Sequence, residues 1–121
     1  METNKIIIFT DGGARGNPGP AAAAYLVTAS GNLIHQQGQA LGTTTNNVAE
    51  YTAVDLALDW LSTYLISHPA TQINFFLDST LVVNQLNGLF KIKHAPLRNL
   101  FLKIKTLEHQ IHLPITYTHI P

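Results

Sequence analysis

The 121-residue sequence contains no cysteine, and only 12% of its residues are charged. The absence of cysteine excludes a disulfide scaffold, a thiolate-bound zinc or iron–sulfur cluster and a thiol nucleophile. No apolar run approaches the ~18–20 residues of a membrane span, and the first residues do not resemble a signal peptide. We therefore expect no membrane association and a cytoplasmic location. Seven Lys and Arg balance seven Asp and Glu, so the net charge predicts no partner.

Hydrophobic residues, in contrast, make up 45% of the chain. That fraction and this length predict one compact domain over residues 1–121. The basic residues are unevenly spread, because five of the seven lie in the acid-free window 91–105. Such a window is typical either of a solvated helix face or of a patch that binds a polyanion. Its basic residues are Lys91, Lys93, Arg98, Lys103 and Lys105.

Hydrophobic periodicity predicts strands first and helices later. Residues 5–10 form a β-branched apolar run without alternation, which favours a strand buried on both faces. Ser30-Gly31-Asn32 has the length and chemistry of a hairpin turn. We therefore predict an α/β fold: a mixed five-stranded sheet, with three antiparallel strands and then two parallel ones, flanked by helices. The expected elements are strands 5–10, 21–29 and 33–41, a helix 48–66, a strand 72–77, a short helix ending at Asn87, a helix 96–110 and a strand 113–120.

The long helix carries one carboxylate on its apolar side. On a helical wheel, Asp55 and Asp59 fall in the polar stripe that should face solvent. Glu50 falls about 180° from the middle of that stripe, on the side that should pack on the sheet. A carboxylate there is costly to bury unless it is paired or binds a metal. The alternative is a capping box, in which Asn47 caps the helix and Glu50 reaches back to it.

Two further acids follow predicted strands. Asp11 comes after the first strand and Asp78 after the fourth; alone, each is explained by an Asx turn or a helix N-cap. Parallel neighbouring strands end at the same edge of a sheet, and the first turn of the long helix can bring Glu50 to that edge. Three carboxylates that repel one another are typical of a site for a hard divalent cation.

The glycine-rich segment 12–19 matches no phosphate-binding motif. It lacks the Gly-Lys-Ser/Thr of a Walker loop and the Gly-x-Gly-x-x-Gly pattern, and it leads into a strand. It fits either an ordinary tight connection or a loop that a nucleic-acid backbone approaches closely. The six histidines show no zinc-binding spacing and are interpreted as ordinary surface or interior residues.

The motifs become specific when they are taken together. They are Phe9-Thr10-Asp11-Gly12-Gly13, Gly16-Asn17-Pro18-Gly19, Thr44-Thr45-Asn46-Asn47-Val48-Ala49-Glu50 and Asp78-Ser79. In this order they resemble type 1 ribonuclease H. The run Val83-Asn84-Gln85-Leu86-Asn87-Gly88, with Lys91 and Lys93, is similar to the compact form of that family, which lacks a long basic protrusion. The resemblance covers essentially the whole chain.

The resemblance implies a ribonuclease H-like fold and an endonuclease that cleaves the RNA strand of RNA–DNA hybrids. The products would be 5′-phosphate and 3′-hydroxyl ends. The cofactors would be two divalent ions, Mg²⁺ or Mn²⁺, with no organic cofactor. Asp11, Glu50 and Asp78 would be the catalytic and metal-binding residues, and Asp11 would bridge both ions.

The resemblance also implies how the hybrid would be recognised. Asparagines would contact the minor groove, where the ribose 2′-OH distinguishes RNA from DNA, and Glu50 can also contact that hydroxyl. Lys91, Lys93 and Arg98 are candidates for phosphate contacts by charge and clustering. The candidate substrate-binding residues are Gly12, Asn17, Asn46, Asn47, Ser79, Lys91 and Lys93.

The sequence departs from the family pattern at its last residues. The family's final strand resembles Thr118-His119-Ile120-Pro121 and continues into a segment with a fourth active-site acid. Since the given chain stops at Pro121, we expect a truncated C-terminal segment or a three-carboxylate variant, and weakened or no activity. The alternative function is a hybrid-binding module without the chemistry; a more remote one is a resolvase or exonuclease of the same superfold.

Overall fold

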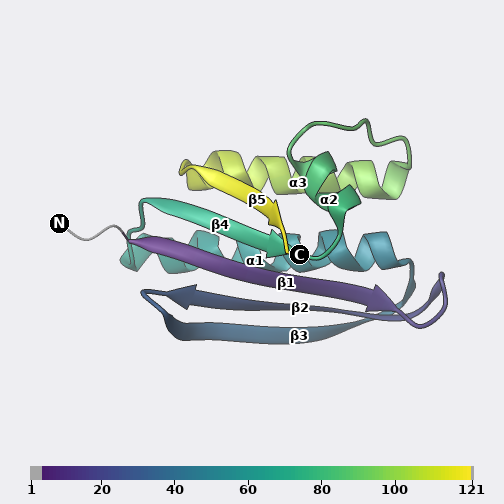
Figure 1. The fold of residues 1–121 in the computed structure, drawn as a ribbon, viewed down its shortest axis with the longest axis horizontal. Helices are drawn as coiled ribbons and strands as arrows, with labels where there is room; N and C mark the ends of the chain where they lie inside the picture. The colour runs from purple at the N-terminus through teal and green to yellow at the C-terminus, as the bar shows by residue number, and fades with distance from the viewer. Residues whose placement is uncertain (1–3, 121) are drawn as a thin grey trace.

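A computed structural model describes residues 4–120 as one sheet and three helices (Figure 1). The strands lie in the order β3-β2-β1-β4-β5; β1 and β2, and β2 and β3, pair antiparallel, whereas β4 pairs parallel with both β1 and β5. The predicted fold class is therefore confirmed. The elements are β1 (Lys5–Ala14), β2 (Gly19–Ala29), β3 (Asn32–Thr44), α1 (Asn46–Ser67), β4 (Gln72–Leu77), α2 (Thr80–Leu86), α3 (Ala95–Ile111) and β5 (Ile115–His119).

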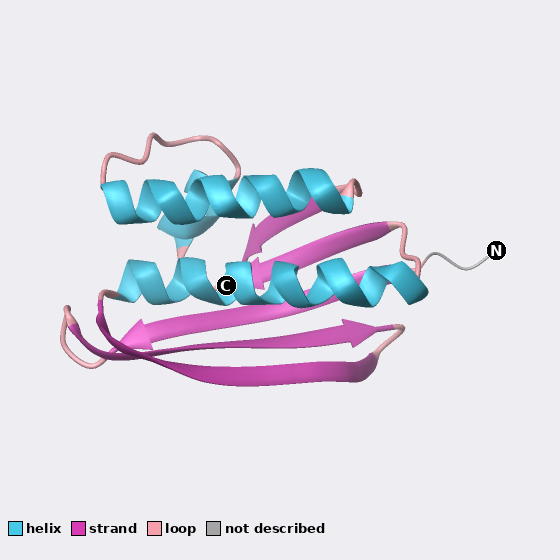
Figure 2. Ribbon diagram, turned by 180° about the vertical axis from the view of Figure 1, so that it is seen from behind, coloured by secondary structure: helices cyan, strands magenta, loops and turns pink. Residues whose placement is uncertain are grey.

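The helices gather on one face of the sheet. Seen from behind, α1 and α3 lie side by side over the strands (Figure 2). The core fills the space between them and the sheet, and its largest fully buried side chains include Ile8, Tyr51, Leu58, Phe75 and Ile104. None of the helices in residues 4–120 is long and apolar enough to cross a membrane.

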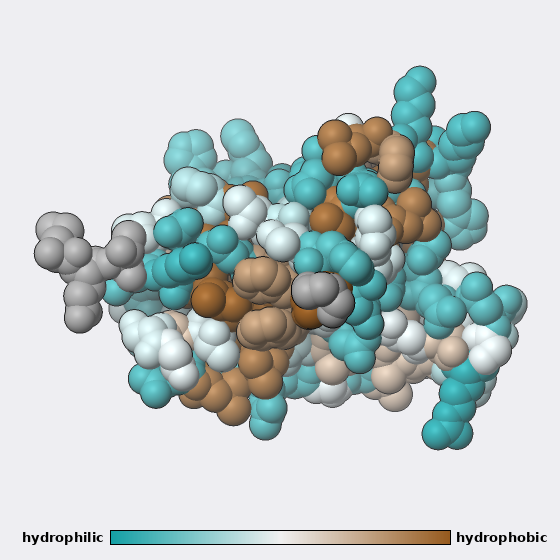
Figure 3. All heavy atoms as spheres, in the orientation of Figure 1, coloured by the Kyte–Doolittle hydropathy of each residue, from teal (hydrophilic) through white to brown (hydrophobic). Residues whose placement is uncertain are grey.

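The opposite face of the sheet carries exposed apolar side chains. Figure 3 shows them gathered over the middle of β1 and its neighbours. The ring of Phe9, which is 41% exposed, stacks on Phe76 with 5.5 Å between ring centroids. The prediction that residues 5–10 are buried on both faces is therefore wrong. Ile6 and Ile8 are buried beneath the helices, whereas no helix of the described chain covers Phe9.

The first hairpin extends further than the sequence predicts. β1 continues to Ala14, which pairs with Ala21, and the Arg15 N–H donates to the carbonyl oxygen of Pro20 at 2.8 Å. Antiparallel pairing thus extends the ladder into the glycine-rich segment. The second hairpin turn is confirmed, since Ser30 and Gly31 both have positive φ, as a two-residue turn requires.

Helix α1 begins with a different cap from the predicted one. The Thr45 hydroxyl accepts a hydrogen bond from Val48 N–H at 3.2 Å, which makes Thr45 the N-cap. The capping box between Asn47 and Glu50 is therefore wrong, because Asn47 already lies inside the helix. The end of the helix agrees with the prediction, since His68 is its C-cap.

The predicted solvent stripe of α1 is also partly wrong. Asp55 is only 6% exposed, and its Oδ2 lies 3.0 Å from Lys103 Nζ on α3. The reason is that α3 packs along this side of α1, which a helical wheel drawn for α1 alone cannot show. Asp59, in the same predicted stripe, is exposed.

Candidate active site

Two of the three predicted acids lie at equivalent positions on neighbouring strands. The parallel pairing of β1 and β4 matches Phe9 with Phe76, so Asp11 and Asp78 each follow two residues later. Asp78 comes directly after β4, as predicted. Asp11 lies within β1 opposite Ala24, which corrects the expectation that the strand ends before it. Both side chains are exposed at one edge of the sheet.

Close packing between β1 and α1 brings Glu50 to this edge. A Cβ atom on Gly12 would lie 2.3 Å from the carbonyl carbon of Ala49 and 2.5 Å from Glu50 N. Only glycine therefore lets the backbone next to Asp11 touch the first turns of α1. The first role of Gly12 is thus to place Glu50 beside Asp11, which the sequence did not reveal.

The Glu50 carboxyl lies in an unfavourable electrostatic environment. Burial, the negative charges of Asp78 and Asp11 and a hydrogen bond with Asp78 together raise its pKa from 4.5 to about 7, and burial is the largest cause. A hydrogen bond from the Ser79 hydroxyl acts in the opposite direction. The structure therefore brings all three predicted acids close enough to influence one another. The prediction that Glu50 lies on the packed side of the helix is confirmed, since this residue is half-buried.

Ser79, not Asp78, caps the next helix. Its hydroxyl accepts a hydrogen bond from Val82 N–H at 3.2 Å at the start of α2. The helix-cap explanation of Asp78 is therefore wrong. The backbone of Asp78 is held instead by β5, because the His119 ring nitrogen Nε2 lies 3.1 Å from the Asp78 carbonyl oxygen, to which it donates.

The asparagines join the glycine-rich segment to the start of α1. Asn46 Oδ1 accepts a hydrogen bond from Ala14 N–H at 2.7 Å, and Asn17 Oδ1 accepts one from Asn46 N–H at 3.0 Å. Asn17 and Asn46 are exposed, whereas Asn47 is half-buried. The structure thus gathers the predicted asparagines on the same side of the site as Gly12.

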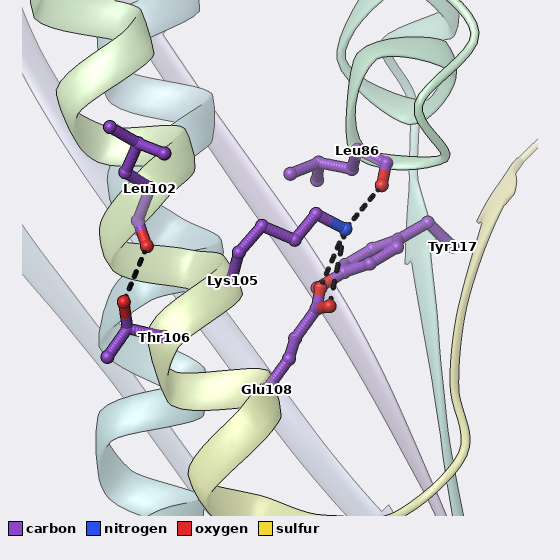
Figure 4. A network of polar contacts seen from close by, with 6 residues as sticks. All are labelled: Leu86, Leu102, Lys105, Thr106, Glu108 and Tyr117. Atoms are coloured by element: carbon purple, nitrogen blue, oxygen red, sulfur yellow. Dashed lines mark hydrogen bonds and ion pairs between the residues drawn. The ribbon is translucent and has the colours of Figure 1, made fainter.

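The predicted basic window divides into two groups. Lys91 and Lys93 are exposed on the segment between α2 and α3. Lys103 pairs with Asp55, and Lys105 donates to the Leu86 carbonyl oxygen at 2.7 Å and to both Glu108 carboxylate oxygens at 3.2 Å (Figure 4). These two lysines are paired with acids of the protein, whereas Arg98 on α3 is exposed like Lys91 and Lys93, so the part of the window that can meet a polyanion is smaller than predicted.

A hollow of about 660 Å³ adjoins the acids on the helix-free face of the sheet. Asp11 and Asp78 line one part of it, and Phe9, Leu26 and Ile120 line another. The sequence analysis missed this feature. The signal for it was present, since β1 residues that alternate with the buried Ile6 and Ile8 are themselves apolar.

The comparisons with known proteins identify the family. The chain matches the sequence profile described as RNase H over residues 3–119. This chain belongs to the RNase H family. It is 37% identical over 119 residues to the bifunctional protein Rv2228c of Mycobacterium tuberculosis, a match covering 97% of this chain and 31% of that protein. The chain thus spans about a third of that relative's length.

Other RNases H are similar over more of their own length. Ribonuclease HI of Halobacterium salinarum is 34% identical over 104 residues, which cover 85% of this chain and 50% of that protein. The crystal structure of LC11-RNase H1 in complex with an RNA/DNA hybrid is 39% identical, with a TM-score of 0.90. That match covers 96% of this chain and 85% of the other. The predicted family and fold are therefore confirmed.

The side chains of Asp11, Glu50 and Asp78 at this edge of the sheet suit a hard divalent cation. All three side chains offer carboxylate oxygens, the ligands that Mg²⁺ and Mn²⁺ prefer. The ion pairs found in residues 4–120, Lys103–Asp55 and Lys105–Glu108, leave these three acids without a cation. Within the same residues, no three His, Asp or Glu side chains are gathered closely enough to hold an ion as they stand. A cation would offset the repulsion that raises the pKa of Glu50.

Proposed function

We propose that this chain is an endonuclease that hydrolyses the RNA strand of RNA–DNA hybrids with bound divalent cations. The observation that carries the proposal is the convergence of Asp11, Glu50 and Asp78, without a balancing cation, on one edge of an RNase H-family sheet. The likeness to LC11-RNase H1, whose structure contains an RNA/DNA hybrid, supports the substrate class.

The three carboxylates are the catalytic and metal-binding residues of this proposal. They would hold two ions, Mg²⁺ or Mn²⁺, with Asp11 shared between them. Bound ions of this kind stabilise the charge of a phosphodiester displacement and lower the pKa of the attacking water. The chain's own contribution is to hold the three acids together. The contact between Gly12 and α1 positions Glu50, and the Ser79 hydroxyl orients the Glu50 carboxyl.

Substrate recognition is assigned to the polar residues around this edge. Asn17 and Asn46 use their Oδ1 atoms in backbone hydrogen bonds, which leaves each Nδ2 group as the donor for the minor groove. Asn47 of α1, Gly12 of β1 and Ser79, the N-cap of α2, complete this proposed surface. The ribose 2′-OH is the group that distinguishes the RNA strand there.

Lys91 and Lys93 are proposed to contact phosphates. Both are exposed, and both come from a segment that contains no acid. Neutralising one phosphate should contribute about one unit to the slope of binding affinity against salt concentration. Because the chain has no net charge, this local patch is the electrostatic attraction for the backbone.

The decisive experiment is an assay of the 121-residue chain with a hybrid labelled on each strand. We expect metal-dependent cutting of the RNA strand alone, with 5′-phosphate products, in Mg²⁺ or Mn²⁺ and none in EDTA. Binding without cutting under all metal conditions would favour the hybrid-binding module. Equal cutting of duplex DNA would contradict the proposal. The rate measured here also tests the expectation that this chain is weakened.

Hybrid recognition has its own test in Asn47→Ala. We expect this variant to weaken binding to the hybrid more than binding to duplex DNA of the same sequence, because only the hybrid offers 2′-hydroxyl groups. Asn32→Ala, an exposed change in the hairpin turn at the far end of β3, is the matched control. Equal loss on both duplexes would remove Asn47 from 2′-OH recognition.

A further inference from the structure

Strand β3 forms a long open edge of the sheet. Its 13 residues, Asn32–Thr44, pair with β2 on one side, and no element of the described chain lies on the other (Figure 1). The opposite edge, β5, has only five residues. An open edge presents unpaired backbone N–H and C=O groups that can pair with another strand.

The β3 edge lacks the usual protection against pairing. Natural edge strands commonly carry lysines or other charges, or a proline, which discourage a second strand from joining them. No Asp, Glu, Lys or Arg occurs anywhere between residues 16 and 49, and β3 contains no proline. Its exposed residues are uncharged: Leu33 near its start, and neutral amides and small residues such as Gln36, Gly38 and Gln39.

The central part of β3 has regular geometry. The register with β2 shifts near both ends of the strand, where Ile34 and Leu41 have no partner in β2. Between these shifts the six residues His35–Ala40 pair without interruption with Val27–Ala22. Irregular pairing protects edges by twisting them. The regular segment His35–Ala40 is therefore the part of the edge that is ready to accept another strand.

We propose that His35–Ala40 pairs antiparallel with the same segment of a second copy of this chain and forms a symmetric dimer. A charged partner strand would lose hydration beside this neutral edge without gaining a counter-charge. A second β3 carries no charge, and the two-fold relation makes the edge self-complementary. The chain also has no net charge, so two copies do not repel one another at long range.

This assignment is independent of the proposed nuclease activity. Asp11 of β1 pairs with Ala24 of β2, which pairs with Gly38 of β3. The open side of β3 therefore faces away from β1 and from Asp11. Pairing at this edge uses none of the three acids. The two proposals can therefore fail separately, because one is measured by assembly and the other by cleavage.

Sedimentation equilibrium of the full 121-residue chain tests the proposal. Since strand pairing alone buries less surface than a standard interface, concentrations from about 1 μM to about 1 mM should be covered. We expect a monomer–dimer equilibrium. The double variant Gln36→Lys, Gln39→Lys should raise the dimer dissociation constant at least about tenfold, because it adds two positive charges to each of the two paired edges and these charges repel one another. Gln110→Lys, exposed on α3, is the control and should leave it unchanged.

A fluorescence measurement shows whether the double variant keeps its fold. Trp60 is the only tryptophan, and its ring stacks on His35 of β3 with 4.3 Å between centroids, so its emission reports the position of this strand. Amide protection of residues 35–40 should rise with protein concentration. The proposal is overturned by a monomer throughout the range, by open-ended aggregates in place of a dimer, or by a dimer that the two lysines do not weaken.

Discussion

Carboxylates occur in two regions of this molecule, and the fold treats them in opposite ways. Where α1, α3 and β5 meet, each acid has a basic partner: Asp55 has Lys103, and Glu108 has Lys105. At the edge formed by β1, α1 and β4, Asp11, Glu50 and Asp78 have only one another and the Ser79 hydroxyl. The first region forms a balanced network, whereas the second concentrates negative charge.

The balanced region shows how this fold satisfies a partly buried acid. Glu108 Oε2 accepts a hydrogen bond from the Tyr117 hydroxyl at 2.5 Å, and the Lys105 ammonium bridges Glu108 to the end of α2 (Figure 4). Burial, reinforced by the charge of Glu108, raises the pKa of Tyr117 well above its ordinary value, so the hydroxyl keeps its proton and donates. This network joins α2, α3 and β5.

The contrast between the paired and the unpaired acids indicates which of them are functional. A protein that pairs Asp55 and Glu108 with lysines gains no stability from three acids left to repel one another. Such an arrangement is retained where an external cation is needed, and strongly perturbed carboxyl groups are typical of functional sites.

The largest effect is expected from Asp11→Asn. Losing a residue that merely orients a metal ligand lowers activity by about 10–100-fold, so losing the ligand itself should reduce hybrid cleavage by more than about 100-fold. Thermal stability should stay equal or rise, because a repelling charge is removed. Asp59→Asn, an exposed change on α1, should leave both properties unchanged. A wild-type cleavage rate in Asp11→Asn would remove this residue from the site.

Next comes Gly12→Ala, which separates β1 from α1 at the acidic edge. The new methyl group would overlap the backbone of Ala49, and overpacking of this kind destabilises by about 1–3 kcal/mol. Cleavage should fall as well, because Glu50 moves away from Asp11. Denaturant unfolding measures the stability. Gly38→Ala is the control, since its Cβ would meet no atom within 4 Å; equal losses in both variants would contradict the close-packing explanation.

In the balanced region, Lys103→Met should destabilise the protein by about 1–2 kcal/mol, which denaturant unfolding measures. Removing one partner leaves Asp55 buried without a counter-charge, and the effect is moderated because Lys103 is 61% exposed. Adding Asp55→Asn should recover part of the loss, and Lys93→Met is the matched exposed control. If Lys103→Met loses no more stability than Lys93→Met, the Lys103–Asp55 pair contributes nothing to the stability of the protein.

The smallest expected effect is the pH dependence of stability in EDTA, because Glu50 is only half-buried and solvent screens much of its charge. Folded Glu50 binds its proton more tightly than the unfolded chain does, because its pKa rises from 4.5 to about 7. The stability from this group is therefore complete below pH 4.5 and is lost as the pH rises through about 7. Thermal unfolding between these pH values should show the fall, and Glu50→Gln should flatten it relative to Asp59→Asn. If the stability of Glu50→Gln falls by the same amount over this pH range, another titrating group causes the fall.

The element order could be predicted because each signal is local. The β-branched run at 5–10, the positive-φ turn at Ser30-Gly31 and the stop at His68 act within a few residues, and the structure agrees with all three. Two of the failed predictions were decided by a distant segment. Pairing with β2 extended β1 past Asp11, and α3 covered Asp55.

The candidate site shows the same division. The sequence supplied the three acids and the expectation that they meet at one sheet edge, because parallel neighbouring strands must end together. It could not show the contact between Gly12 and Ala49, the Ser79 cap or the hydrogen bond from His119 to the Asp78 backbone. The first and the last of these join elements far apart in the chain, whereas the Ser79 cap is a local contact with Val82.

The sequence by itself determined the order of the elements, the absence of charge in residues 32–44 and the identities of the acids. Periodicity, turn chemistry and residue type are properties of neighbouring positions. The tertiary structure decided which acids are balanced and which are left to repel one another. Asp55 and Glu50 lie on the same helix, yet one faces Lys103 and the other faces two carboxylates. The electrostatic energy of a charge depends on the groups packed around it, and packing brings those groups together from distant parts of the chain.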